Sequence, residues 1–237
     1  MPIVQLSDTL PTTELVPVVH DLYRDIHKAI RVELFSVTTE AARLDASTGI
    51  ARAALASQVR DVVAFLVDHA EHEDGAIQPV LERELPILAA KVAEDHEALD
   101  ARMGGLVEMA EDAARLDAEE PGFQVHRLHL ALASFTSAYL EHQDVEERVI
   151  MPTLQQTVGV DAVVGIHQAI LAGIPPEKMG AALALMLPAI NIDDRLEMLG
   201  GMRDNAPAEV FDGVWSLANS VLDPGDLSDL AKRLGII

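Results

Sequence analysis

Apolar residues recur every three to four positions over four long stretches of the chain, a spacing typical of amphipathic helices. In the second stretch, one face carries Val59, Val62, Phe65 and Leu66. Turn-forming sequences separate the stretches and place the expected helices at about residues 12–44, 51–84, 86–116 and 123–156. Rods of this length are about 45 Å long, and short connections between them favour antiparallel neighbours. The pattern predicts an all-α fold built on an antiparallel four-helix bundle.

Glycine and proline positions refine these helices. The sequence "TTELVP" should cap the first helix near Thr12 or Thr13. Pro79 and Pro152 lack an N–H, so each should kink or end its helix within a turn or two. Gly104 and Gly105 are expected to loosen the middle of the third helix.

The pattern of long helical segments ends after residue 158. Shorter helical pieces follow, and they are interrupted at "GIPPEK", "LPAINIDD", "NAPAEV" and "LDPGDL". Asp193 with Asp194, and later Asp226, precede segments that read as short capped helices. We therefore expect a bundle domain over residues 1–158 and a small helical extension over residues 159–237, which carries no visible chemical motif.

Composition narrows the classes of function. The 237 residues include 39 acidic and 17 basic ones, for a formal net charge of −22, which argues against binding nucleic acid or an anionic membrane. There is no cysteine, so thiolate metal sites and cysteine nucleophiles are excluded. The N-terminus lacks the features of a secretory signal and the longest apolar run is too short to span a bilayer, so we expect a cytoplasmic protein.

One polar cassette occurs twice, as "HAEHEDGAIQPVLE" from residue 69 and "HQDVEERVIMPTL" from residue 142. An ungapped alignment places His69 on His142 and Glu73 on Glu146. A histidine and a glutamate four residues apart share one helix face. A single such pair would be an ordinary surface pair, but both histidines fall in register with core positions. Buried carboxylates without basic partners cost several kcal/mol, so the cassettes call for cations.

The other two long helices each contribute one histidine to the same pattern, His27 in "RDIHKAI" and His96 in "AEDHEAL". Four histidines and two glutamates, distributed over four helices, are the ligands that a dinuclear metal site in a bundle core requires. Imidazole and carboxylate together suit iron, zinc or manganese, and the histidine-rich set favours iron.

The order His27, His69/Glu73, His96, His142/Glu146 resembles that of the hemerythrin-like, or HHE cation-binding, family over about residues 12–156. The resemblance implies two non-haem iron ions with an oxo or hydroxo bridge. It implies that His27 and His69 bind one iron, that His96 and His142 bind the other, and that Glu73 and Glu146 bridge them. The exogenous ligand would be O2, H2O2 or NO.

This sequence departs from the oxygen-carrying hemerythrins, which have a second histidine one turn along the third helix, where this chain has Asp100. Their last cassette also uses an aspartate at a longer spacing, where this chain has Glu146. Reactivity or sensing is therefore favoured over reversible oxygen carriage. A ferritin-like diiron protein would need Glu-x-x-His pairs, and the sequence contains none.

The leading hypothesis is a diiron protein that binds or reacts with these small ligands, with an oxidoreductase activity towards peroxide or NO left open. Two alternatives remain. One is a sensor of ligand or iron that signals through the helices of residues 159–237 to a protein partner or to a second copy. The other is a structural or iron-storage site. Also open are a role for Tyr23 near the ligand, for Asp100 in coordination, and for Asp74 and Glu147 as acceptors for ligand histidines.

Overall fold

The computed structural model describes residues 15–115 and 119–236, and over these ranges it is helical and contains no strand. Four long helices dominate the chain: α1 (Arg24–Arg43), α2 (Gly49–Ala76), α4 (Pro86–Ala114) and α5 (Pro121–Val145). Shorter elements follow α2 and α5: α3 (Gln78–Glu84), the π-helix η2 (Glu146–Ile150), α6 (Met151–Val158) and α7 (Val160–Gly173). The C-terminal part contains α8 (Pro176–Ala189), α9 (Ile192–Asn205), α10 (Ala208–Val221) and α11 (Pro224–Leu234).

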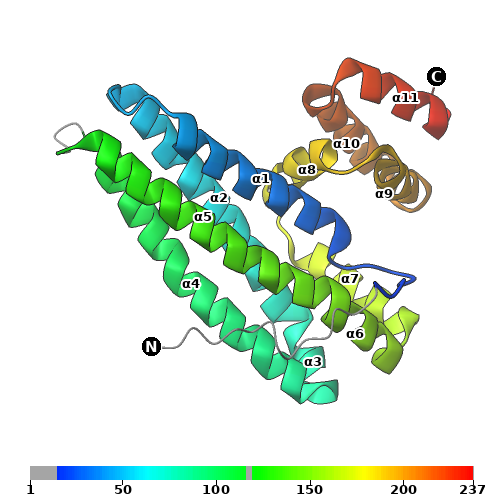
Figure 1. Ribbon diagram of the computed structural model, residues 1–237. Helices are drawn as coiled ribbons and strands as arrows, with labels where there is room; N and C mark the ends of the chain where they lie inside the picture. The colour runs from blue at the N-terminus through cyan, green and yellow to red at the C-terminus, as the bar shows by residue number, and fades with distance from the viewer. Residues whose placement is uncertain (1–14, 116–118, 237) are drawn as a thin grey trace.

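The four long helices lie side by side and form the antiparallel bundle expected from the sequence (Figure 1). Helix α1 packs between α2 and α5, and α4 packs between the same two helices on the opposite side. Each long helix therefore has two long neighbours and faces the bundle axis. A residue on the inner face of any of the four can reach the same central space.

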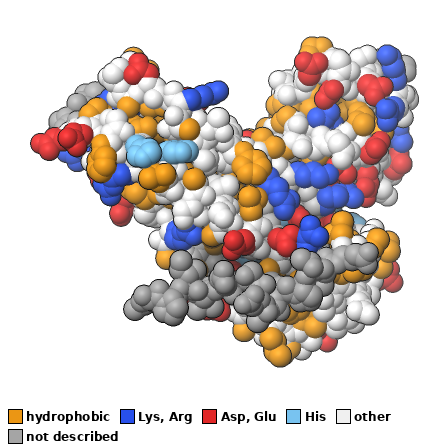
Figure 2. All heavy atoms as spheres, viewed as in Figure 1, with side chains coloured by type: hydrophobic (Ala, Val, Ile, Leu, Met, Phe, Trp, Pro, Cys, Tyr) orange, Lys and Arg blue, Asp and Glu red, His pale blue; other side chains and the backbone are white. Residues whose placement is uncertain are grey.

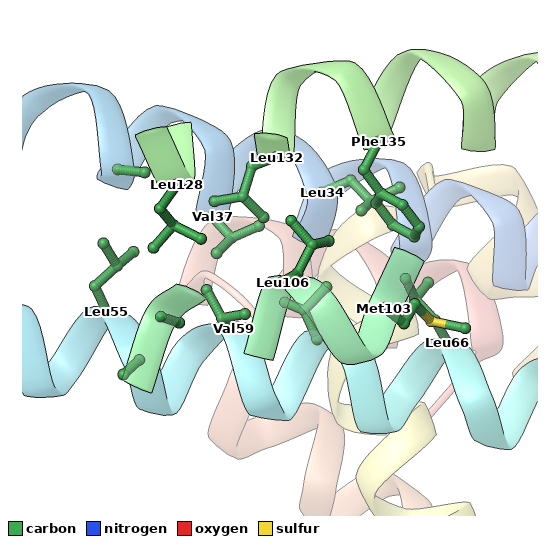
Figure 3. Close-up of a cluster of buried hydrophobic side chains, with 14 of the residues drawn as sticks. Leu34, Val37, Leu55, Val59, Leu66, Met103, Leu106, Leu128, Leu132 and Phe135 are labelled. Carbon is green, nitrogen blue, oxygen red and sulfur yellow. The ribbon is translucent and has the colours of Figure 1, made fainter. Parts of the chain in front are cut away.

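Leucine and valine side chains fill most of the bundle axis (Figure 3). Leu34 of α1, Leu66 of α2 and Phe135 of α5 are each at most 1% exposed. Burying an aliphatic side chain of this size stabilises a fold by about 1.5–3 kcal/mol. The apolar stripe ends near one end of the bundle, where histidines and glutamates take over the inner positions. This core fixes the helix backbones on one side of those polar residues.

The two cassette prolines act as the sequence predicts, by different routes. Helix α2 ends at Ala76, and Pro79 lies in the first turn of the short helix α3. The fourth helix instead passes through η2, in which the amide of Met151 donates to the carbonyl oxygen of Glu146, and Pro152 then opens α6. A π-turn inserts one extra residue into the helix, and the chain continues from α5 into α6 without a break before it ends at Val158.

The expected start of the first helix was wrong. Residues 12–14 lie outside the described residues, and residues 15–23 are not helical. Helix α1 begins at Arg24, where the side chain of Asp21 accepts hydrogen bonds from the amides of Tyr23 and Arg24 at 3.0 and 3.1 Å. A short polar side chain that takes up the free N–H groups of a first turn defines a helix start.

The expected loosening of the third helix was also wrong, because α4 runs through Gly104 and Gly105 without interruption. Leu99, Met103, Leu106 and Ala110 on the same helix are buried in the bundle core. The burial of this stripe outweighs the roughly 1 kcal/mol that each glycine costs in a helix interior.

Helices α8–α11 surround a small core of their own, which contains Leu187, Leu199, Ala218, Leu222, Leu230 and Leu234. The predicted interruptions after residue 158 are confirmed, since each falls at the junction of two helices. The predicted caps were displaced by a few residues. Asn191 caps α9 by accepting from the amides of Asp193 and Asp194, and Asp223 caps α11 by accepting from Gly225.

The C-terminal helices meet the bundle through α8 and α9, which pack beside α1. Lys28 of α1 binds Asp194 of α9, and Arg24 of α1 binds Glu197 of α9 at 2.9 Å. Figure 2 shows basic and acidic side chains gathered at this junction. Ion pairs to α9 thus add to the packing of α8 on α1.

Among the described residues, no single helix has the length and apolar character needed to cross a membrane. One bent pair, residues 121–158 with residues 160–173, meets those criteria by length and composition alone.

Candidate metal centre

All six residues that the sequence proposes as metal ligands lie together where the apolar core ends. His27 comes from α1, His69 and Glu73 from α2, His96 from α4, His142 from α5 and Glu146 from the first position of η2. None is more than 9% exposed. Their ligand atoms form two overlapping groups, and the atoms of each group lie within 4.8 Å of one another. The first group is His27, His69 and Glu73, and the second is Glu73, His96, His142 and Glu146.

The carboxylate of Glu73 divides its two oxygens between the histidine pairs. Its Oε1 lies 3.0 Å from His69 Nε2 and 3.9 Å from His27 Nε2. Its Oε2 lies 3.4 Å from His96 Nε2, on the other side. One oxygen thus faces the pair from α1 and α2, and the other faces the pair from α4 and α5.

Glu146 repeats this division from the opposite side of the cluster. Its Oε1 lies 3.2 Å from His142 Nε2, whereas its Oε2 lies 3.5 Å from His27 Nε2. The paired rings approach edge to face, with centroids 5.2 Å apart for His27 and His69 and 4.9 Å apart for His96 and His142. The two carboxylates therefore stand between two imidazole pairs.

The buried ligand atoms fit metal cations because the protein leaves them without hydrogen bonds. Among the described residues, both oxygens of Glu73 and of Glu146, and the Nε2 atoms of His27 and His69, are buried and have no hydrogen-bond partner. Metal–ligand bonds of about 2.1 Å place neighbouring ligand atoms about 3.0–3.4 Å apart in octahedral or tetrahedral geometry. The distances of 3.0, 3.2 and 3.4 Å around Glu73 and Glu146 fall in that range, and the distance of 3.5 Å between Glu146 and His27 lies just above it.

Two of the cluster's histidines have an acidic residue at Nδ1, the outer nitrogen, which faces away from the centre. Each of these acidic residues directly follows one of the two central glutamates in sequence. Asp74 lies 2.9 Å from His96 Nδ1, and Glu147 lies 3.0 Å from His27 Nδ1. Arg31 binds both oxygens of Glu147 at 2.7 and 3.0 Å. A carboxylate at Nδ1 fixes the ring and leaves Nε2 free to face a metal. Asp74 and Glu147 therefore serve as hydrogen-bond acceptors, the role that the sequence left open for them.

Without bound metal, the cluster's charges are balanced by protons. Burial alone would lower the pKa of His96, but the close approach to Glu73 outweighs burial and raises this pKa to about 9. Burial likewise opposes protonation of His142, whereas the charge of Glu146 and contact with Asp95 raise its pKa to about 10. Burial raises the pKa of Glu73, but the neighbouring histidines, His69 foremost, lower it well below its usual value. An ionised Glu73 thus lies among imidazoles of which His96 and His142 are held in their charged form.

Both tyrosines of the chain border the cluster. The ring of Tyr23 lies 5.0 Å from that of His27, and the ring of Tyr139 lies 5.9 Å from that of His142. Burial, together with the charges of Glu73 and Glu146, raises the pKa of each phenol well above its usual value, so both stay protonated. The sequence singled out Tyr23 but not Tyr139. Its place three residues before His142 was the available signal for its contact with the site.

The other histidines and Asp100 lie outside both groups of ligand atoms. Asp100 is exposed on α4, and His72 is half-buried on α2. His126 and His129 occur together near the start of α5, with ring centroids 6.3 Å apart. His20 and His167 pair with each other, with His20 Nε2 2.7 Å from His167 Nδ1.

The fold and the buried cluster together define a four-helix-bundle protein with a site that fits metal cations. The family model of the hemerythrin HHE cation-binding domain matches residues 18–154, which is more than half of the chain. The chain therefore belongs to the hemerythrin HHE cation-binding domain family. No curated protein and no solved structure gives a significant match.

Proposed function

We propose that the chain is a non-haem diiron protein whose buried centre binds or reacts with O2, H2O2 or NO. His27 and His69 would hold one iron, His96 and His142 the other, and Glu73 and Glu146 would bridge them. The observation that carries this proposal is the division of each buried carboxylate between two histidine pairs. In a site for a single ion, the oxygens of each carboxylate that bind metal would face the same histidine pair. Bound iron would supply redox electrons and an exchangeable coordination position.

The protein's own contribution would be orientation and the exclusion of water. Glu147 and Asp74 hold the rings of His27 and His96 by their Nδ1 atoms, so that the Nε2 atoms face the centre. The apolar core of the bundle and the buried side chains of Tyr23 and Tyr139 keep bulk solvent away from the centre. The protonated phenol of Tyr23 can donate a hydrogen bond within the gap that it lines with Glu73 and Glu146.

The proposal is tested by metal content and spectroscopy on protein purified from iron-supplemented cells. We expect about two irons per chain and an absorption spectrum that responds to peroxide or NO. The His69→Ala variant should lose iron, whereas His72→Ala, on the same helix but outside the cluster, should retain it. Zinc with a silent spectrum would identify a structural site. Two irons that respond to none of the three ligands would identify iron storage.

A sensor function is a second candidate, and a specific contact favours it. The helix that carries His27 also carries Arg24 and Lys28, which bind Glu197 and Asp194 of α9. A shift of α1 on a change of ligand or oxidation state would move the partners of these ion pairs. The C-terminal helices could pass that shift to a protein partner or to a second copy of the chain.

The sensor function predicts that ligand or oxidation state changes protease cleavage within α8–α11. Cleavage rates should be compared for the iron-loaded protein before and after addition of peroxide, with Lys28→Met as a variant that loosens the junction in every state. Equal cleavage rates of the wild-type protein in all states would rule out signalling through these helices.

A further inference from the structure

The segment before α1 crosses the end of the bundle next to the metal centre. We define the strap as residues 18–23, none of which is helical. Val18 and Leu22 are half-buried against an apolar cluster that includes Ile77, Ile150 and Leu154. Tyr23, at the end of the strap, is 2% exposed. The strap therefore lies against the bundle, and it joins the hydrogen bonds of α1 only at its last residue, where the carbonyl oxygen of Tyr23 accepts from the amide of His27 at 2.9 Å.

Helices α6 and α7 supply the hydrogen bonds that the strap's backbone lacks. The side-chain oxygen of Gln155 accepts from the amides of Val19 and His20, each at 3.0 Å. His167 of α7 lies 2.7 Å from the ring of His20, and the amide of Leu22 points at the sulfur of Met151 at 3.5 Å. Gln155 and His167 both lie beyond residue 154, where the match to the family model ends.

The strap holds Tyr23 over a crevice that leads to the central carboxylates. Tyr23 lines this crevice together with Glu73 and Glu146, and apolar side chains such as Leu81 and Val92 complete it. The crevice leaves no space for a water molecule in this arrangement. A metal ion or a small ligand that approaches Glu73 and Glu146 from this side therefore needs a lining side chain to move, and Tyr23 is the lining residue that the strap carries.

We propose that Gln155 and His167 are positioning residues that hold the strap closed, so that α6 and α7 control the rate at which metal and small ligands pass Tyr23. This inference rests on the proposed metal centre. It assigns a role to side chains outside the matched domain. We call Gln155 and His167 together the latch. Gln155 binds two neighbouring amides at once, so it contributes most to holding the strap, and the single ring contact of His167 contributes less.

The rate of iron loss to an excess of a ferrous chelator tests the latch in the iron-loaded protein. Gln155→Ala removes two hydrogen bonds and should speed release roughly ten-fold, and His167→Ala should speed it less. Gln155→Glu keeps an acceptor oxygen and should restore slow release. Gln156→Ala changes the adjacent exposed residue and should match the wild type. Equal release from the Gln155→Ala and Gln156→Ala variants would overturn the proposal.

A double variant separates an action through Tyr23 from a general loss of stability. Tyr23→Leu alone should speed release, and adding Gln155→Ala should speed it no further. Multiplied effects of the two changes would overturn the proposal, because Gln155 would then act by another route. Thermal melting of each variant shows whether the bundle itself has loosened.

Hydrogen exchange keeps this inference distinct from the metal proposal. Metal content measured before the chelator is added tests the centre itself. Even if the wild-type protein holds no metal, Gln155→Ala must raise amide exchange over residues 18–23 compared with Gln156→Ala. Unchanged exchange over the strap would refute the latch, whatever the metal content.

Discussion

Metal uptake by this protein should release protons, and the number of protons released follows from the protonation of His96 and His142. The pKa of His96 is raised to about 9 and that of His142 to about 10, so at pH 7 both rings carry a proton at the nitrogen that faces the centre. A metal binds only the neutral imidazole. Removing these protons at pH 7 costs about 3 kcal/mol for His96 and about 4 kcal/mol for His142, at about 1.4 kcal/mol per pH unit.

Calorimetric titration of the metal-free protein with ferrous iron, in buffers that differ in ionisation enthalpy, measures this release. We expect about two protons to leave His96 and His142 per chain at pH 7, and the apparent affinity to rise with pH by up to about ten-fold per proton per pH unit. As pH rises through about 9 and 10 the release should fall, and above about pH 11 it should vanish, because both rings are then already neutral.

A matched pair of variants tests the assignment of these protons. His142→Ala should reduce the number released at pH 7 by about one, whereas His72→Ala, outside the cluster, should leave it unchanged. Iron uptake by the wild-type protein at pH 7 without proton release would refute the reasoning. It would mean that Glu73 and Glu146 do not hold these imidazoles in their charged form.

Three further predictions concern stability and the outer acceptors. A histidine whose folded pKa is raised stabilises the fold fully below about pH 6.5 and loses that effect as pH rises through its folded value, so the metal-free protein should melt at a lower temperature at pH 10.5 than at pH 7. Asp74→Asn should weaken metal affinity by about 10–100-fold, measured by competition with a chelator, with little change in helix content. Leu66→Ala should cost about 2–5 kcal/mol in the free energy of unfolding measured with urea, and a loss below about 1 kcal/mol would contradict the close packing of this core.

The sequence was sufficient to predict the bundle because the signals that specify it are local and repeated. The apolar stripes of α2 and α4 have the helical period, and burial of those stripes dominates their energetics. Four of the six clustered residues, His69 with Glu73 and His142 with Glu146, could be predicted for a related reason. A histidine and a glutamate four residues apart must share a face, and the core register of that face directs both into the bundle.

What the sequence could not provide depends on contacts between distant segments. The start of α1 was misplaced because Asp21 caps it, whereas "TTELVP" offered an equally good local signal further upstream. The contact of Tyr139 with His142 was hidden because a core tyrosine and a tyrosine beside a metal centre have the same helical spacing. The hydrogen bonds from Val19 and His20 to Gln155 join residues that are 136 and 135 positions apart in the sequence, and no local pattern can predict such contacts.

The acceptors behind the histidines cross between the two halves of the bundle. His27 belongs to the first helical hairpin, α1 and α2, but its outer nitrogen is held by Glu147, just beyond the second hairpin, α4 and α5. His96 belongs to the second hairpin, yet its outer nitrogen is held by Asp74 of the first. Each half thus orients one histidine of the other.

This exchange makes the centre a product of assembly, since neither hairpin contains it. During synthesis on the ribosome, the six clustered residues and their acceptors cannot be complete until Glu147 has been added, however early the first hairpin forms. A fragment that stops after α2 would carry His27, His69 and Glu73 but would leave His27 without its acceptor. Because each hairpin supplies an acceptor to the other, the centre is complete only when both hairpins have been made and have docked.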